Sequence, residues 1–464
     1  MTQLTDLVSA TTIQAVLNEA MGRGADFAEV FCEDRVNRSA SLDDGRVEEL
    51  STGAERGAGI RVVVGGTTGF AHTADLSEAS LLEAARTAAS VARGGSSRTV
   101  AVGTPQRHRA HASEGIDATP TAMKLALLTQ VDEVARSEGG AIAQVQAGYM
   151  EGRRQILVAN SDGVFSTDDQ VRTRFNVICV ASGDTGLQTG FESAAHTRGF
   201  EMFEDIDVAE MARLAARRAI TKLSARPAPS GELPVVLANA GGVLFHEACG
   251  HGLEADHILK DSSVYAGKVG ELVASPLVTL VDDGSMTGEW GYASIDDEGH
   301  PSTRNVLIEN GVLTDYMWDM LRARKQGRAG SGNGRRQSYQ HLPIVRMTNT
   351  FVMEGTQDPE EIVAQTTKGV YVAKLGGGQV NTATGDFVFG TTEAYLIENG
   401  EITAPIRDVN MVGNGPDVLR SIDAVGSDFS MVPGTCGKQG QGVPVGCGQP
   451  TLRLAGITFG GTAA

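Results

Sequence analysis

The spacing of apolar residues predicts four helices in the first half of the chain. Apolar side chains recur every three to four residues in segments 5–21, 121–137 and 208–223, and a fourth helix is expected behind Ser77, running to Gly94. Such spacing gathers the apolar side chains on one face of a helix. Ser77 suits the position before a helix because its hydroxyl can accept a hydrogen bond from an amide of the first turn. We therefore expect helices that flank a sheet.

Alternating apolar and polar residues predict the strands between these helices. A strand is expected over 27–33, followed by a hairpin whose arms, 39–42 and 47–50, flank an Asp-Asp-Gly turn. Further along, glycines divide the alternating pattern into four short segments, which indicate an antiparallel meander rather than βαβ units. These segments cover 143–150, 155–159, 172–181 and 186–192.

The rest of the chain contains mostly strands and glycine-rich loops. It begins with the apolar strand 233–237, and Asp-Gly or Asn-Gly pairs predict hairpin turns at 282–284, 309–311 and 398–400. The stretch 225–231, which is rich in Pro, Ser and Gly, is the clearest connector between domains.

These patterns indicate an α+β protein with predominantly antiparallel sheets and flanking helices. We predict three domains, because 464 residues exceed the size of one ordinary core. They are an N-terminal α+β domain (1–115), a middle α+β meander domain (116–228) and a strand-rich C-terminal domain (229–464).

Composition narrows the classes of function. Hydrophobic residues make up 41% of the chain and charged residues 21%, as in ordinary folded proteins. The net charge of -18 repels a phosphate backbone, so direct binding of nucleic acid is not expected. The sequence shows neither the pattern of a signal peptide nor an apolar stretch long enough to span a bilayer. Five widely spaced cysteines favour reduced thiols, so we expect a soluble, cytoplasmic protein without membrane contact.

Candidate chemistry is concentrated in the string HEACGH at 246–251. A zinc-dependent hydrolase requires nitrogen or anionic ligands, an open coordination position and a carboxylate that takes a proton from water. His246 and His251 supply two nitrogen ligands, and Glu247 supplies the carboxylate. Apolar residues and glycines flank the string, so an unpartnered charge there would be unfavourable. A bound zinc ion would remove that penalty, and the string is therefore a candidate for the metal site of a peptidase.

The two histidines stand five residues apart rather than the four of the familiar metallopeptidase helix. On a regular α-helix this step corresponds to a rotation of about 500°, which leaves the two rings about 140° apart around the axis. Both imidazoles can bind one ion only if the helix contains a π-bulge or breaks at Gly250 or Gly252. We predict such a distortion.

A third ligand is expected from elsewhere in the chain, because two histidines are too few for a stable catalytic zinc site. Cys436 has the best local setting, since glycines lie on both sides and Lys438 favours the thiolate that zinc requires. Cys447 and Cys249 suit packing better, although the sulfur of Cys249 could lie near the metal. The candidates are Glu254, Asp256, His257, His300, His341, Cys436 and Cys447.

Several longer strings occur together in the second half of the chain. They include HEACGHGLEAD (246–256), IDDEGHP (295–301), GNGRRQSYQHLPIVRMTNT (332–350), GGGQVNTATGDFVF (376–389) and CGKQGQGVPVGCGQPTL (436–452). Together they resemble the metal-bearing, TldD-type members of the TldD/PmbA (TldE) family of peptidases. The resemblance is dense from about residue 234 to the C-terminus and thinner, but consistent in layout, before that.

The resemblance implies a ligand set and a reaction. It implies one zinc ion per chain, held by His246, His251 and Cys436, with Glu247 as the catalytic carboxylate. The implied activity is hydrolysis of peptide bonds in unfolded or flexible peptides, by zinc-activated water with Glu247 as general base. The implied partner is a TldE/PmbA-like subunit in a heterodimer, and a second copy in a homodimer is the alternative. Small aliphatic residues are expected where this chain has cysteines at 249 and 447.

Two other functions fit parts of the sequence. A non-catalytic regulatory or binding subunit would use the strand-rich surface, but it leaves the histidine string unexplained. A cysteine peptidase with Cys436 as nucleophile would resist chelators and be inactivated by alkylation. The residue that stabilises the oxyanion stays open among Arg336, Tyr339 and His341.

Overall fold

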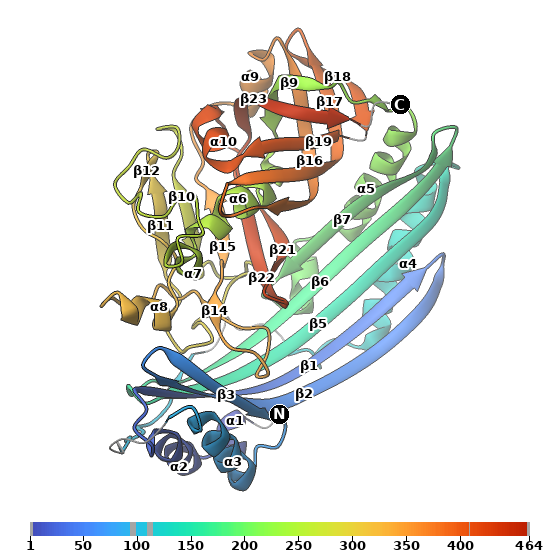
Figure 1. The fold of residues 1–464 in the computed structure, drawn as a ribbon. Helices are drawn as coiled ribbons and strands as arrows, with labels where there is room; N and C mark the ends of the chain where they lie inside the picture. Colours follow the sequence, from blue (N-terminus) through green and yellow to red (C-terminus); the bar gives the residue numbers. More distant parts are fainter. Residues whose placement is uncertain (1–2, 93–98, 109–114, 408, 462–464) are drawn as a thin grey trace.

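The structure is a computed structural model and describes residues 3–92, 99–108, 115–407 and 409–461. One long, curved sheet runs beside a strand-rich C-terminal half (Figure 1). The predicted α+β class with predominantly antiparallel sheets and flanking helices is confirmed.

The curved sheet is antiparallel apart from one short edge strand. Its order is β3-β2-β1-β5-β6, with β7 paired to β6 and the two-residue β4 (Gln106–Arg107) parallel to β6. The long strands are β1 (Phe27–Asp43), β2 (Arg46–Val64), β3 (Thr67–Thr73), β5 (Ile142–Asn160), β6 (Phe165–Gly183) and β7 (Gly186–His196).

Two details of the strand prediction are wrong. The predicted strand and hairpin arm before the Asp-Asp-Gly turn belong to one strand, β1, and the four segments of the meander form only three strands. Gly152 lies inside β5, where the strand packs closely against β1. A Cβ at Gly152 would lie 2.5 Å from Oδ1 of Asn37 in β1.

The helices lie close to their predicted positions. α4 (Thr121–Ser137) and α5 (Val208–Leu223) match the predicted ranges, and α3 (Glu78–Ala89) follows Ser77, whose hydroxyl accepts from the amide of Ser80. The first predicted helix is divided into α1 (Leu4–Leu7) and α2 (Ala10–Met21). It is divided because Ser9 is extended and caps α2 by accepting from the amide of Thr12.

The predicted N-terminal and middle domains share the curved sheet through the pairing of β1 with β5. Their cores are separate: α2 and α3 pack on one part of the sheet, and α4 and α5 pack on another. A short helix η1 (Phe200–Glu204) precedes α5.

The C-terminal half contains two main sheets. The first has the order β12-β11-β10-β15-β22-β21, and the second has the order β16-β9-β23-β19-β17-β18-β8, with β20 paired to β23. The first consists of β10 (Leu280–Asp283), β11 (Arg304–Glu309), β12 (Val312–Leu313), β15 (Asn349–Val352), β21 (Ser430–Lys438) and β22 (Gln441–Gln449). The second consists of β8 (Arg226–Pro227), β9 (Gly231–Leu237), β16 (Lys368–Val380), β17 (Asp386–Glu398), β18 (Glu401–Arg407), β19 (Val409–Asn414), β20 (Ile422–Val425) and β23 (Leu452–Gly461).

Short elements fill the space around these sheets. Strands β13 and β14 form a separate pair. The short elements are η2 (Asn239–Gly241), α6 (Val243–Ala248), η3 (Gly250–Leu253), α7 (Ala255–Ile258), α8 (Met320–Lys325), β13 (Gly334–Arg335), β14 (Ile344–Val345), α9 (Pro359–Ala364) and α10 (Gly415–Ser421).

Two of the three predicted hairpin turns are present. Asn310 and Asn399 adopt positive φ angles, each followed by a glycine, in the turns β11–β12 and β17–β18. The third prediction is wrong, because Asp282 and its neighbour lie inside β10, which pairs with β11 only after a long excursion. Asp282 is buried and accepts hydrogen bonds from Asn333, Thr348 and Thr350, so its carboxylate holds several segments together.

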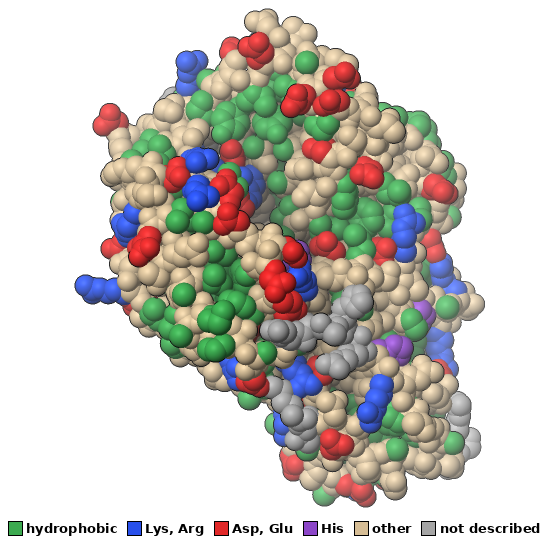
Figure 2. Space-filling model, turned by 180° about the vertical axis from the view of Figure 1, so that it is seen from behind, with side chains coloured by type: hydrophobic (Ala, Val, Ile, Leu, Met, Phe, Trp, Pro, Cys, Tyr) green, Lys and Arg blue, Asp and Glu red, His purple; other side chains and the backbone are tan. Residues whose placement is uncertain are grey.

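The largest hydrophobic core lies in the C-terminal half and includes side chains of both main sheets and of α6. None of the helices in the described part of the chain combines the length and the apolar character required to span a bilayer. On the face seen from behind, Lys and Arg side chains are interspersed with Asp and Glu (Figure 2).

Candidate metal centre

The helix that carries the histidines breaks between them, as the spacing requires. α6 ends at Ala248, Cys249 leaves helical geometry with φ -126° and ψ -47°, and the chain continues as the 3₁₀ turn η3. The break lies one residue before Gly250, which is itself needed for packing. A Cβ at Gly250 would lie 2.1 Å from the sulfur of Met347. The predicted distortion is therefore present, at Cys249.

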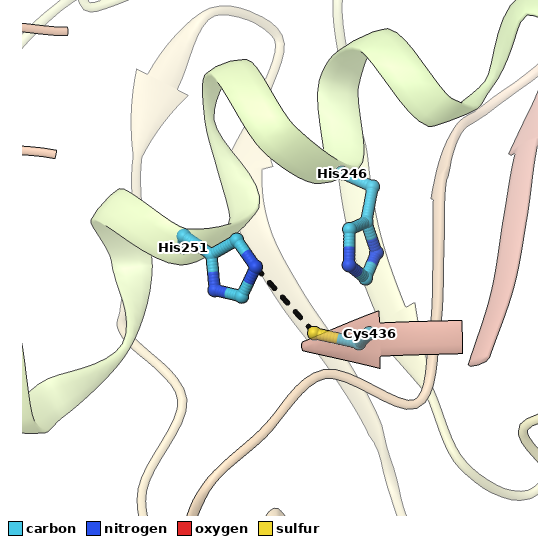
Figure 3. A group of neighbouring side chains, drawn as sticks. All are labelled: His246, His251 and Cys436. Atoms are coloured by element: carbon cyan, nitrogen blue, oxygen red, sulfur yellow. Dashed lines mark hydrogen bonds between the residues drawn. The ribbon is translucent and has the colours of Figure 1, made fainter. Parts of the chain in front are cut away.

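The break brings both imidazoles to the same side of the segment. Their ring centroids lie 5.4 Å apart, with an angle of 82° between the planes. Cys436, on β21, points its sulfur toward both rings, and this sulfur lies 3.4 Å from Nε2 of His251 (Figure 3). One ligand atom from each of the three residues lies within 4.8 Å of the others. All three side chains are buried.

These separations suit a tetrahedral zinc ion. Zn–S and Zn–N bonds of about 2.3 and 2.0 Å place a sulfur and a nitrogen ligand roughly 3.6 Å apart. The observed 3.4 Å between Cys436 and His251 is close to that value.

The nitrogens of His246 give an independent indication of a missing ligand. His246 is 2% exposed, and neither Nδ1 nor Nε2 makes a hydrogen bond of normal geometry, although the thiols of Cys436 and Cys447 lie beside the ring. A buried polar atom without a partner is unfavourable by about 1–3 kcal/mol. A metal ion bound to one ring nitrogen would remove part of this penalty. The three side chains therefore fit a bound metal ion.

His251 is oriented by a carboxylate behind it. Its Nδ1 lies 2.9 Å from Oε2 of Glu254, which also accepts from Lys438 at 2.9 Å. Donation from Nδ1 would leave Nε2 free to bind a metal ion beside Cys436, as in metal sites where a carboxylate fixes the histidine tautomer. Burial raises the pKa of Glu254, but the opposing effect of His251 and Lys438 is larger and lowers this pKa to about 2. Glu254 was a candidate ligand by sequence, and the structure places it behind the histidine instead.

The electrostatic setting favours a thiolate at Cys436. Burial raises the pKa of this thiol, but the adjacent His246 and His251 lower it well below its ordinary value. For His251, burial lowers the pKa, and Glu254 and Cys436 raise it to about 10. The three side chains therefore form a polar group whose sulfur is ready to bind a cation.

Glu247 is the acid next to this group that remains open to water. Its side chain is 22% exposed, and its Oε2 lies 3.9 Å from Nε2 of His251. The position is that expected for a carboxylate that exchanges protons with a water beside the ligands.

The remaining candidate ligands lie outside the group. Asp256 and His257 form a second group with Glu254, again with ligand atoms within 4.8 Å of one another. Nζ of Lys438 donates to Glu254 and Asp256, so an ammonium already lies between these carboxylates and offsets part of their charge. Nδ1 of His300 lies 2.9 Å from the Pro301 carbonyl, and Nδ1 of His341 lies 2.9 Å from the Ser338 hydroxyl.

The two other cysteines of this region are buried close to the histidines. Cys447 lies on β22, opposite Val432 of β21, and its proximity to His246 helps raise the pKa of that imidazole against the opposing effect of burial. Burial raises the pKa of Cys249 to about 12, which fits a packing role.

Two of the candidate oxyanion donors make contacts with strand β1 of the curved sheet. Arg336 pairs with Glu29 of β1, and the amide of Tyr339 donates to Glu33 of the same strand. The choice among Arg336, Tyr339 and His341 as oxyanion donor stays open. No local pattern predicts these contacts, because their partners are about 300 residues away.

Comparison with protein families assigns most of the chain to one family. Residues 28–92, 114–223 and 230–461 match, in order, PmbA/TldA metallopeptidase domain 1, the central domain and the C-terminal domain. The "Metalloprotease TldD homolog" of Haemophilus influenzae is 38% identical, over 98% of this chain and 97% of its own. A "Zinc metalloprotease TldD homolog" of Saccharolobus solfataricus is 31% identical, over 56% of this chain and 58% of its own.

A solved structure shares the whole architecture. TldE from Thermococcus kodakarensis superposes with a TM-score of 0.75 at 21% identity, covering 97% of this chain and 100% of that chain. At this level of identity the likeness concerns the fold.

The fold, the buried histidine pair and the relatives together define a metallopeptidase. The chain belongs to the TldD/PmbA family, and the resemblance of its sequence to the TldD-type members is confirmed.

Proposed function

We propose that this protein is a zinc peptidase in which His246, His251 and Cys436 hold one zinc ion. The observation that carries the proposal is the convergence of these three buried side chains, with both nitrogens of His246 left without partners. The donor set of two imidazoles and one thiolate is typical of zinc. The name of the relative from Saccharolobus solfataricus, which includes zinc, supports the same metal.

The side chains divide the chemistry between them. Zinc, when bound, supplies the Lewis acidity that lowers the pKa of a water and polarises a carbonyl. Glu247 accepts a proton from the attacking water and passes it to the leaving amine. Glu254 keeps His251 in the required tautomer, and Lys438 keeps Glu254 ionised and in place.

We propose unfolded or flexible peptides as substrates and a TldE/PmbA-like subunit or a second copy of the chain as partner. Exposed sheet edges can bind extended peptides through main-chain hydrogen bonds, which give little sequence preference. The TldE of Thermococcus kodakarensis has the same fold, which supports pairing between chains of this shape. All five cysteines are free and buried, which supports a cytoplasmic location.

The test compares wild type with Glu247→Ala on an unstructured peptide, with the zinc content measured for both. Glu247→Ala is expected to keep zinc and to lose turnover by about 10²–10⁴-fold. A chelator should abolish wild-type activity, and added zinc should restore it.

Three results would contradict the proposal. Equal cleavage by the two proteins would exclude Glu247 as the base. Chelator-resistant activity that alkylation abolishes would favour Cys436 as nucleophile. Purification without stoichiometric zinc and without cleavage would favour a regulatory subunit.

A further inference from the structure

A cavity of about 370 Å³ lies between the curved sheet and the C-terminal half. Strands β5 and β6 line one side, and the β21–β22 hairpin lines another. Thr435 lines the cavity and directly precedes Cys436, so the cavity adjoins the strand that carries the thiolate of the metal centre. Six arginines line it: Arg35, Arg153, Arg154, Arg172, Arg335 and Arg336.

Two of these arginines have no carboxylate partner among the described residues. Arg172 donates to the amide oxygen of Gln170 and to the carbonyls of Trp290 and Tyr292. Arg335 donates to the carbonyls of Met347 and Pro444. The direct hydrogen bonds of both guanidinium groups therefore go to neutral acceptors, with Asp297 nearby but not bonded to either.

Two further arginines have unused donors although their charges are paired. Arg336 is 1% exposed and pairs with Glu29, yet its Nε and Nη1 have no partner. Arg154 pairs with Glu33 and Asp297, and its buried Nη2 has no partner. Buried donors of this kind are unfavourable unless a ligand accepts from them.

The acids that line the cavity do not balance these charges. Asp297 is already paired with Arg154 and accepts from the amide of Arg336. Burial and the nearby Glu298 raise the pKa of Asp296 well above its ordinary value, which favours its neutral form. Burial and neighbouring arginines lower the pKa of Arg172 to about 9 and that of Arg335 to about 10. Among the side chains that line the cavity, arginines therefore outnumber acids, and Arg172 and Arg335 are the two without an ion-pair partner.

We propose that this cavity binds a carboxylate of the substrate peptide, either its C-terminus or an acidic side chain. The inference rests on the proposed peptidase function and adds a preference among substrates. Guanidinium groups suit this role because their planar donors can bind a carboxylate through two hydrogen bonds. The hairpin links the two sites: Arg335 binds its backbone at Pro444, and Arg346 donates to the carbonyl of Cys436.

The test uses three unstructured peptides that differ only at the C-terminal group and at one side chain. The first has a free C-terminus and no acidic side chain, the second is amidated and has none, and the third is amidated and contains one Glu. Binding is measured by calorimetry on zinc-loaded Glu247→Gln, so that the result does not depend on turnover. At least one carboxylate-bearing peptide is expected to bind about tenfold tighter than the neutral one, as for a charged hydrogen bond.

Variants of Arg172, made in the same background, assign the preference to the cavity. Arg172→Gln should abolish the preference while the affinity for the neutral peptide changes less than about twofold. Arg172→Lys should keep part of it, because the charge remains. Arg174→Gln is the matched control, since Arg174 lies two residues along the same strand and outside the cavity lining.

The outcomes separate this inference from the proposed function. Preference for the free C-terminus or for the Glu peptide identifies the source of the carboxylate. Equal binding of all three peptides would overturn the inference. So would an Arg172→Gln variant that weakens binding of the neutral peptide as much as binding of the carboxylate-bearing peptides. A carboxylate preference without cleavage in wild type would support the cavity and contradict the peptidase proposal.

Discussion

Two groups of three potential metal ligands lie next to each other in the C-terminal half. They differ in whether a side chain of the protein already pairs with the ligand atoms. In the first group, His246, His251 and Cys436 face one another, and the nitrogens of His246 have no partner. In the second, Glu254, Asp256 and His257 are equally close, but the ammonium of Lys438 lies among their oxygens. Glu254 contacts both groups through His251 and Lys438.

The comparison shows that proximity of ligand-type residues does not by itself define a metal site. Both groups satisfy the same distance limit. They differ in hydrogen bonding and charge, because the ring nitrogens of His246 lack hydrogen-bond partners in the first group, whereas an ammonium of the protein lies between the carboxylates of the second. The first group is therefore expected to bind zinc, and the second is expected to support it.

The largest effect is expected when a ligand of the first group is removed. Cys436→Ala should weaken zinc binding by about 3–5 kcal/mol, roughly one ligand's share of a typical zinc site, and abolish turnover. Zinc content after dialysis measures this effect directly. Cys179→Ala, a buried cysteine in the curved sheet, is the control. Retention of stoichiometric zinc by Cys436→Ala would remove the thiolate from the proposed ligand set.

The next effect concerns the ammonium of the second group. Lys438→Met leaves Glu254 and Asp256 buried without their cation, so the free energy of unfolding of the zinc-free protein should fall by about 3 kcal/mol. Denaturant unfolding measures this change. The exposed Lys260→Met should change stability by less than about 0.5 kcal/mol. An unchanged stability of Lys438→Met would mean that the second group does not depend on its ammonium.

The sequence predicted the site better than the long-range contacts around it. The break near Gly250 followed from helix geometry, because two rings five residues apart cannot meet on a regular helix. Cys436 was favoured by its neighbours in sequence. The role of Glu254 was not predicted, because its hydrogen bonds to His251 and Lys438 depend on the path of the chain between η3 and β21.

For the fold as well, the sequence predicted local elements but not the contacts between distant segments. Helices α4 and α5 follow from apolar spacing alone, since each packs one face on a sheet. The pairing of β1 with β5, which joins the first two predicted domains in one sheet, has no local signal. The arginine cavity was missed for the same reason, because its lining comes from strands that are far apart in sequence.

A smaller effect is expected at Glu254, the residue of the second group that contacts the first. Glu254→Gln keeps the shape of the side chain but weakens its hold on His251, so zinc affinity should fall about 10–100-fold. Competition with a chelator of known affinity measures the change. Most of the loss in zinc affinity should appear as a faster rate of zinc release, since the ligands themselves remain. An affinity equal to that of wild type would show that Glu254 does not position His251.

The smallest effect is expected from the histidine of the second group. His257→Asn should leave zinc stoichiometry at one ion per chain and zinc affinity within about twofold, because Lys438 already occupies the position where a cation would bind. His246→Asn, the same substitution in the first group, is the matched comparison and should lose zinc. If His257→Asn instead lowered the stoichiometry, the second group would itself hold metal. The difference between these two substitutions therefore tests whether unmet hydrogen bonds, rather than the number of nearby ligands, decide where zinc binds.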